Sequence, residues 1–236
     1  MLKGGLILKI RGNIAERSFF IGSVTDPYNP QEAEYKRTRA FLEQMQGSDA
    51  KISIQTKSDL VLRDLDLIKT FSDARVGFSI NTLDENFRED MDNASSIESR
   101  LAAMKAFYDA EVRTTCFISP IFPGITDAET IIDRVKDNCN LIWLENLNLR
   151  GSYKTVIMDY ISDKYPALFP LYKEIYSDKN RMYWKMLNAR LREYAKKNAL
   201  DYVRNNDTIK QPFDAKPVIV NFFYHEEIKK SARKNI

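Results

Sequence analysis

The stretch FFIGSVTDPYNPQE, Phe19–Glu32, joins an apolar run to the start of a helix and sets the pattern for the fold. Its first residues are of the aromatic and β-branched types that strands favour. Asn29 can cap a following helix, Pro30 suits the first helical position, and Glu32 lies three residues beyond the cap. A strand that passes at once into a capped helix predicts the first unit of an alternating α/β structure.

The same alternation continues along the chain. Five runs rich in Ile, Val, Phe or Thr are separated by longer segments with the helical spacing of apolar residues. Connections of helix length imply parallel strands, so the predicted fold class is α/β, with a parallel sheet covered by helices. The predicted strands span residues 17–24, 51–57, 74–82, 112–122 and 141–149.

The last third of the sequence has a different character. Beyond residue 151, aromatic-rich amphipathic segments follow one another without strand-like runs between them. We therefore predict two parts, an α/β domain over residues 1–151 and a helical C-terminal extension over residues 152–236.

Composition narrows the class of protein. The 236 residues are 44% hydrophobic and 29% charged, a balance typical of soluble globular proteins. No apolar run approaches the ~20 residues of a membrane-spanning helix, so no membrane partner is predicted. Two cysteines, Cys116 and Cys139, are too few for a disulfide framework and lack the spacing of a metal site. These features favour a cytoplasmic protein, and a net charge of +3 permits a nucleic-acid partner without arguing for one.

Polar residues gather where the predicted strands end, and ligands of parallel sheets bind at those ends. Each such residue is more often structural than functional, because turns and helix caps also need polar side chains. Lys57 has two open interpretations, as a ligand-binding cation or as the partner of Asp26. His225, the only histidine, is interpreted as a packed or surface residue, and no catalytic residue is assigned. The polar rim comprises Thr25, Asp26, Tyr28 and Asn29, then Gln55, Thr56, Lys57 and Ser58, then Ser79, Asn81 and Thr82, then Ser119, and finally Glu145, Asn146, Asn148 and Arg150.

Four blocks of the sequence resemble, in the same order, the radical S-adenosylmethionine (radical SAM) proteins of the spore photoproduct lyase-like group, many of which are labelled DNA repair photolyases. The two most specific blocks are TDPYNPQE (25–32) and TKSDLVLRDLDL (56–67), and the resemblance extends from about Gly22 to Gly151. It implies a partial (β/α)6 barrel and a [4Fe–4S] cluster held by three cysteines of a CxxxCxxC loop. It also implies bound S-adenosylmethionine, whose reductive cleavage yields a 5′-deoxyadenosyl radical.

The resemblance also implies roles for individual positions. Residues after the first predicted strand match the contact to the methionyl amino group. By the same resemblance, Lys57 after the second strand faces the cofactor or the substrate. Ser79 and Asn81 after the third strand reach the ribose or the carboxylate, and Gly124 and Asn146 lie near the adenine. The cofactor-binding residues implied in this way are Thr25, Asp26, Tyr28, Lys57, Ser79, Asn81 and Asn146.

The sequence departs from the family at the cluster. It contains no CxxxCxxC, its two cysteines fall on the fourth predicted strand and at the entrance of the fifth, and no metal ligands are predicted. We therefore expect a barrel that lacks its first strand, with residues 1–10 approaching strand two and the five predicted strands serving as strands two to six. A missing N-terminal segment or a partner chain would complete this barrel. The isolated chain is then expected to generate no radical.

Three functions remain open from the sequence. The leading one is a radical SAM enzyme domain with an unknown substrate, for which a nucleic acid is one candidate. The second is a cluster-less nucleotide-binding or partner protein built on the same barrel. The third is an ordinary barrel enzyme that uses Asp26, Lys57 and Glu145 as acid–base groups.

Overall fold

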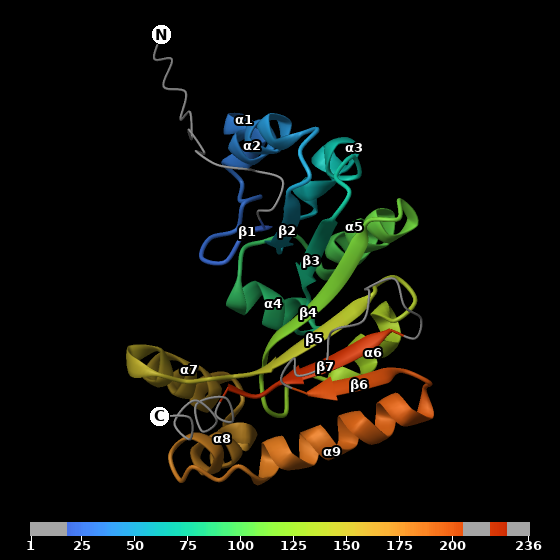
Figure 1. Ribbon diagram of the computed structural model, residues 1–236. Coiled ribbons are helices and arrows are strands. Elements are labelled where there is room, and N and C mark those ends of the chain that lie inside the picture. The colour runs from blue at the N-terminus through green and yellow to red at the C-terminus, as the bar shows by residue number, and fades with distance from the viewer. Residues whose placement is uncertain (1–17, 205–217, 226–236) are drawn as a thin grey trace, which may run out of the picture.

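A seven-stranded, all-parallel sheet organises the protein, seen here in a computed structural model that describes residues 18–204 and 218–225 (Figure 1). The strand order is β1-β2-β3-β4-β5-β7-β6, and the sheet is curved and open rather than closed. The strands are β1 (Ser18–Ile21), β2 (Lys51–Thr56), β3 (Ala74–Ser79), β4 (Arg113–Ile121), β5 (Leu141–Asn146), β6 (Asp201–Arg204) and β7 (Ile219–Phe223).

Helices connect the strands and lie along one side of the sheet (Figure 1). Among the described residues, no helix covers the other face of the sheet, and the candidate site lies there. The α-helices are α1 (Glu32–Tyr35), α2 (Arg37–Met45), α3 (Leu65–Ile68), α4 (Glu85–Met91), α5 (Ile97–Asp109), α6 (Ala128–Val135), α7 (Gly151–Lys164), α8 (Phe169–Tyr176) and α9 (Met182–Lys197), with short 3₁₀ helices η2 (Asp59–Asp64) and η3 (Pro166–Leu168).

The five predicted strands are confirmed as β1 to β5, and with them the α/β class and the parallel sheet. Ser58 and Asp127 cap the following helices, where their side chains accept bonds from Leu60 N and Thr130 N. The approach of residues 1–10 to the sheet concerns a segment outside the described residues.

The first helix start differs from the prediction. The helix is broken at Lys36, whose positive φ of 48° separates α1 from α2. Asn29 caps only the turn before α1, where its Oδ1 accepts a bond from Gln31 N. The Glu32 side chain points toward the following helix rather than toward the start of its own. Its carboxylate accepts bonds from Thr38 N and Arg39 N at the start of α2. It satisfies amide groups of the second helix, not of its own.

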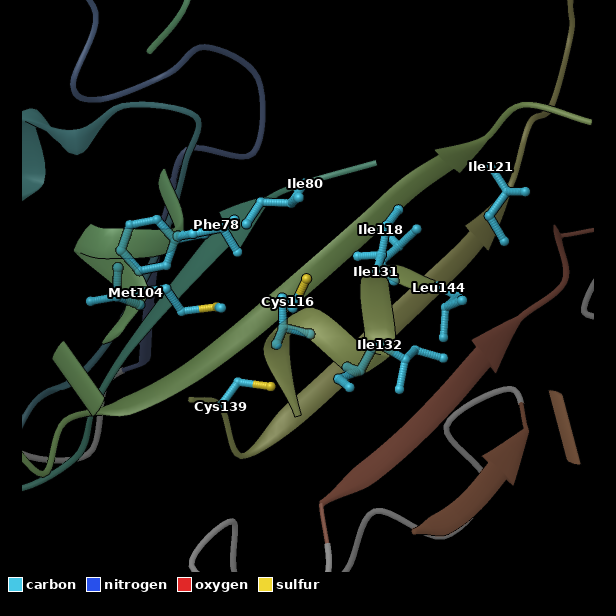
Figure 2. Close-up of a cluster of buried hydrophobic side chains, with 14 of the residues drawn as sticks. Phe78, Ile80, Met104, Cys116, Ile118, Ile121, Ile131, Ile132, Cys139 and Leu144 are labelled. Carbon is cyan, nitrogen blue, oxygen red and sulfur yellow. The ribbon is translucent and has the colours of Figure 1, made fainter. Parts of the chain in front are cut away.

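The core fills the space between the sheet and its helices. Figure 2 shows Phe78, Cys116, Ile118 and Leu144 from the strands meeting residues of α5 and α6. Alternate strand residues are buried here because successive side chains of a strand point to opposite faces. Both cysteines belong to this apolar layer and are fully buried.

The region after residue 151 contains the predicted helices α7, α8 and α9, but it also adds two strands. The strands β6 and β7, of four and five residues, were not predicted, although β1 is equally short. The chain reaches the sheet edge at β6 and then inserts β7 beside β5. The division at residues 151 and 152 stays a prediction.

Tyrosine hydroxyls, those of Tyr160 and Tyr183 among them, join the C-terminal helices to the rest of the fold. The Tyr160 hydroxyl donates to Asp90 at 2.8 Å, and Gly124 N donates to the Tyr183 hydroxyl at 3.2 Å.

Across the described part of the chain, every helix is too short or too polar to traverse a lipid bilayer.

Candidate functional site

A cavity of about 640 Å³ lies on the uncovered face of the sheet. This volume falls within the range of roughly 300–1,000 Å³ typical of small-molecule sites. Most of its lining consists of strand residues that alternate with the core residues, so they point away from the helices. The lining includes Gln55, Arg75, Thr115, Phe117, Trp143 and Glu145.

Glu145 supplies a carboxylate to the lining of this cavity. Its carboxylate accepts hydrogen bonds from Trp143 Nε1 at 2.9 Å and from Ser119 Oγ at 3.0 Å. His225 Nε2 lies 3.5 Å from Glu145 Oε2, and the main-chain amide of His225 donates to Asn146 Oδ1 at 3.0 Å. Residues from β4, β5 and the end of β7 therefore converge on one carboxylate.

These contacts keep the Glu145 carboxylate charged. Burial raises the pKa of the Glu145 carboxyl, but the contacts with His225, Trp143 and Ser119 outweigh burial and hold that pKa below its ordinary value. A fixed negative charge beside an aromatic wall suits a cationic or hydroxyl-bearing ligand.

An aromatic row crosses the same face from β4 to the end of β7. Phe117 and Trp143 have ring centroids 6.5 Å apart, and Trp143 stacks on Phe223 at 5.6 Å. The His225 ring meets Phe223 edge-on at 5.0 Å. Such a row offers flat apolar surface to a planar ligand.

Asp26 lies at the neighbouring strand ends, as predicted, but its carboxylate is engaged within the chain. It accepts bonds from Thr56 Oγ1 at 2.7 Å, from Lys57 N at 2.7 Å and from Tyr28 N at 2.9 Å. These bonds hold the loop after β1 to the end of β2. Thr25 stands exposed on the same loop.

The predicted residues Asp26, Tyr28 and Lys57 line a second cavity of about 530 Å³, beside the α4–α5 loop. Lys57 Nζ pairs with Asp92 at 3.1 Å rather than with Asp26, and its predicted contact with a ligand stays a prediction. Since Glu145 lines the first cavity and the other two groups line the second, the structure does not assemble the acid–base set Asp26, Lys57 and Glu145.

Tyr28 points into the protein. It is buried, and its hydroxyl donates to Asp64 Oδ2 at 3.1 Å. Burial first, and then the charge of Asp64, raises the pKa of Tyr28 far above its ordinary value, so the phenol stays protonated. Its observed role is to complete a buried ionic network.

Of the remaining predicted residues, Ser79 and Asn81 bond to residues of neighbouring strands, whereas Asn146 lies on the helix-facing side of the sheet. Ser79 Oγ accepts a bond from Gln55 Nε2 at 3.1 Å, and Asn81 Nδ2 donates to Pro120 O at 3.2 Å. Asn146 is buried and alternates with Glu145, so it belongs to the helix-facing side of β5. Their predicted cofactor contacts stay predictions.

Sequence reasoning missed the aromatic row and the contact of His225 with Glu145. Phe117 and Trp143 have the same strand parity as Glu145, a signal that period-2 alternation already carried. The contact of His225 with Glu145 had no such signal, because it joins residues 80 positions apart.

The residues present do not fit an iron–sulfur cluster. The sequence has only two cysteines, and both side chains are packed in the apolar core shown in Figure 2. Burial raises the pKa of both thiols, Cys139 to about 12, which disfavours the thiolate that binds iron. Within residues 18–204 and 218–225, no three His, Cys, Asp or Glu side chains are grouped as metal ligands.

Comparison with known proteins identifies relatives. The model of the radical SAM superfamily matches residues 6–135. An uncharacterized protein of Methanocaldococcus jannaschii is 38% identical over 163 residues, 69% of this chain and 62% of that protein. An uncharacterized protein of Mycobacterium tuberculosis is 26% identical over 165 residues, 66% of this chain and 48% of that protein. The chain therefore spans about three-fifths and one-half of the lengths of these two relatives.

Two solved structures are also similar. Spore photoproduct lyase complexed with dinucleoside spore photoproduct shares 19% identity at a TM-score of 0.46, over 65% of this chain and 48% of that one. Streptococcus suis SuiB bound to S-adenosylmethionine shares 13% identity at a TM-score of 0.45, over 63% and 37% of the two chains.

Proposed function

The chain belongs to the radical SAM superfamily, and from this premise we propose that it is the S-adenosylmethionine-binding domain of an enzyme of the spore photoproduct lyase-like group. The observation that carries the proposal is the cavity in which the Glu145 carboxylate stands beside the aromatic row. The sequence blocks around Asp26 and Lys57 support the narrower group. The substrate is unassigned, and a nucleic acid is one candidate.

The cavity offers groups that match this cofactor. The faces of Phe117 and Trp143 suit the flat adenine, and an aromatic face also attracts a sulfonium cation. The Glu145 carboxylate suits ribose hydroxyls or the positive charge of the methionyl part. When bound and cleaved, S-adenosylmethionine supplies a 5′-deoxyadenosyl group to radical chemistry. The protein's own part is to bind and orient it.

Binding should depend on the charge of Glu145. We expect Glu145→Gln to weaken S-adenosylmethionine binding by about ten- to a hundredfold, because a bond to a charged acceptor is worth roughly 1.5–3 kcal/mol. Isothermal titration calorimetry on the full chain measures this. Glu98→Gln, an exposed change on α5 away from the cavity, should leave the affinity unchanged. Equal affinities for Glu145→Gln and the native chain would remove the support for this site.

We also propose that the 236-residue chain does not perform radical chemistry by itself, since its cysteines do not fit a cluster. Anaerobic reconstitution with iron and sulfide should therefore give no stoichiometric [4Fe–4S] absorption and no 5′-deoxyadenosine. The Cys116→Ala, Cys139→Ala double variant should behave identically. A cluster that forms in the native chain and is lost in this variant would contradict the proposal.

Both cysteines are free thiols, which supports a reducing, cytoplasmic location.

The second candidate is a nucleotide-binding or partner protein without radical chemistry. The missing cluster ligands favour it, as does the edge strand β1, which carries the exposed Phe20 in the described sheet. Calorimetry separates the two candidates. A radical SAM domain should prefer S-adenosylmethionine over adenosine, whereas a general nucleotide site should bind both with similar affinity.

A further inference from the structure

The end of the cavity that lies away from the carboxyl ends of the strands is lined by polar and cationic side chains. Strand register places Gln55, Gly77 and Thr115 side by side on β2, β3 and β4. Arg75 lies two residues before Gly77 and lines the same cavity. We call these residues the inner half, in contrast to the outer half formed by Phe117, Trp143 and Glu145.

Thr115 carries the first observation. It lines the cavity and is only 7% exposed, yet its hydroxyl has no hydrogen-bond partner among the residues that the structure describes. Buried hydroxyls are nearly always bonded, because an unpartnered one costs about 1–3 kcal/mol. A ligand group in the cavity would supply the missing partner.

Gly77 carries the second observation. A Cβ at this position would lie 2.1 Å from Gln55 Oε1, so the carboxamide of Gln55 lies directly over the glycine. Gln55 Nε2 is held there by Ser79 Oγ at 3.1 Å. A side chain on β3 would displace this amide, so the glycine keeps a polar floor beside Thr115.

Positive charge at this end is the third observation. Asp73 pairs with Arg113 at 3.1 Å and with Lys51 at 3.8 Å, and its charge also reaches Arg75. Burial lowers the pKa of Arg75, but a guanidinium stays protonated in proteins. Three cationic side chains and one carboxylate thus lie near one another at this end, and of these four Arg75 lines the cavity.

We propose that the inner half binds an oxyanion, a phosphate or a carboxylate, of a substrate that lies next to the cofactor. Arg75 and the Thr115 hydroxyl are the groups that hold it. The inference rests on the proposed function, because it treats this end as the substrate side of a cavity whose outer half takes the cofactor.

Calorimetry on the full chain with three probes tests the proposal. Uridine 5′-monophosphate carries a planar ring and a phosphate, benzoate a ring and a carboxylate, and uridine a ring without an anion. We expect at least one anionic probe to bind about tenfold or more tightly than uridine. The anionic probe that binds identifies phosphate or carboxylate as the group. Equal binding of all three, or of none, would overturn the proposal.

The variant Thr115→Val sharpens the test. We expect it to weaken the bound anionic probe by about five- to tenfold, while the melting temperature stays the same or rises because an unpartnered hydroxyl is removed. Thr114→Val is the matched control, since the Thr114 hydroxyl donates to Asn138 O at 3.2 Å. It should lower the melting temperature and leave probe binding unchanged.

Failure of this inference and failure of the proposed function give different results. S-adenosylhomocysteine reports on the outer half, and Thr115→Val should leave its affinity unchanged. If Thr115→Val weakens S-adenosylhomocysteine as much as the anionic probe, Thr115 belongs to the cofactor site and the inference is wrong. If no S-adenosyl compound binds but the anionic probe still depends on Thr115, the proposed function fails and the oxyanion site stands.

Discussion

Asp64→Asn is expected to lower the free energy of unfolding by about 3–5 kcal/mol, the effect typical of breaking a buried ion pair. The Asp64 side chain is 0% exposed. It accepts bonds from Arg39 Nη1, Arg63 Nε and Arg63 Nη2, each at 2.9 Å, and from the Tyr28 hydroxyl. Asparagine leaves two guanidinium groups without their shared charge. Urea unfolding measures the loss.

Asp66→Asn is the matched control. Asp66 also contacts Arg39, but its side chain is 65% exposed, so the change should cost less than about 1 kcal/mol. Similar losses for the two variants would show that burial does not decide the effect.

The same network predicts a pH dependence. Burial raises the pKa of the Asp64 carboxyl, but the bonds from Arg63 and Arg39 outweigh it and the net shift is downward. Stability from a carboxyl with a lowered pKa is present above its unfolded value of about 3.9 and is lost as the pH falls through the folded value. The difference between native and Asp64→Asn should therefore be constant above about pH 5 and shrink at lower pH.

Arg100→Met is expected to cost a similar 3–5 kcal/mol, because it removes a cation that serves three acceptors. Arg100 is 2% exposed and lies on α5. Its guanidinium donates to Ser79 O at 3.0 Å, to Ser95 O at 2.8 Å and to Asp92 Oδ1 at 2.7 Å. It joins the end of β3 to the loop whose Asp92 holds Lys57. Methionine fills the space but satisfies none of these oxygens.

Chemical denaturation of Arg100→Met beside Arg134→Met checks this expectation. Arg134 pairs with Glu98 on the surface and its side chain is 55% exposed, so its loss should cost no more than about 1 kcal/mol. An Arg100→Met protein as stable as Arg134→Met would show that water replaces the buried bonds.

Local patterns in the sequence were sufficient for most of the α/β frame. The strands β1 to β5 and the caps at Ser58 and Asp127 depend on neighbouring residues, so they were predictable. The break at Lys36 was not, because Glu32, which caps α2, is held by Arg63, 31 positions further along the chain. The strands β6 and β7 were missed, and their place in the sheet is set by the pairing of β7 with β5 and of β6 with β7.

For the candidate site, too, some features could be predicted from the sequence and others depended on the tertiary structure. By itself the sequence determined the family, the parallel sheet and the polar strand ends, because residue order and period-2 alternation encode them. Only the tertiary structure decided that Tyr28 is buried against Asp64, that Lys57 pairs with Asp92, and that His225 meets Glu145. Each of these contacts joins residues at least 35 positions apart. Such a contact is set by how strands align and how loops pack, which no local pattern specifies.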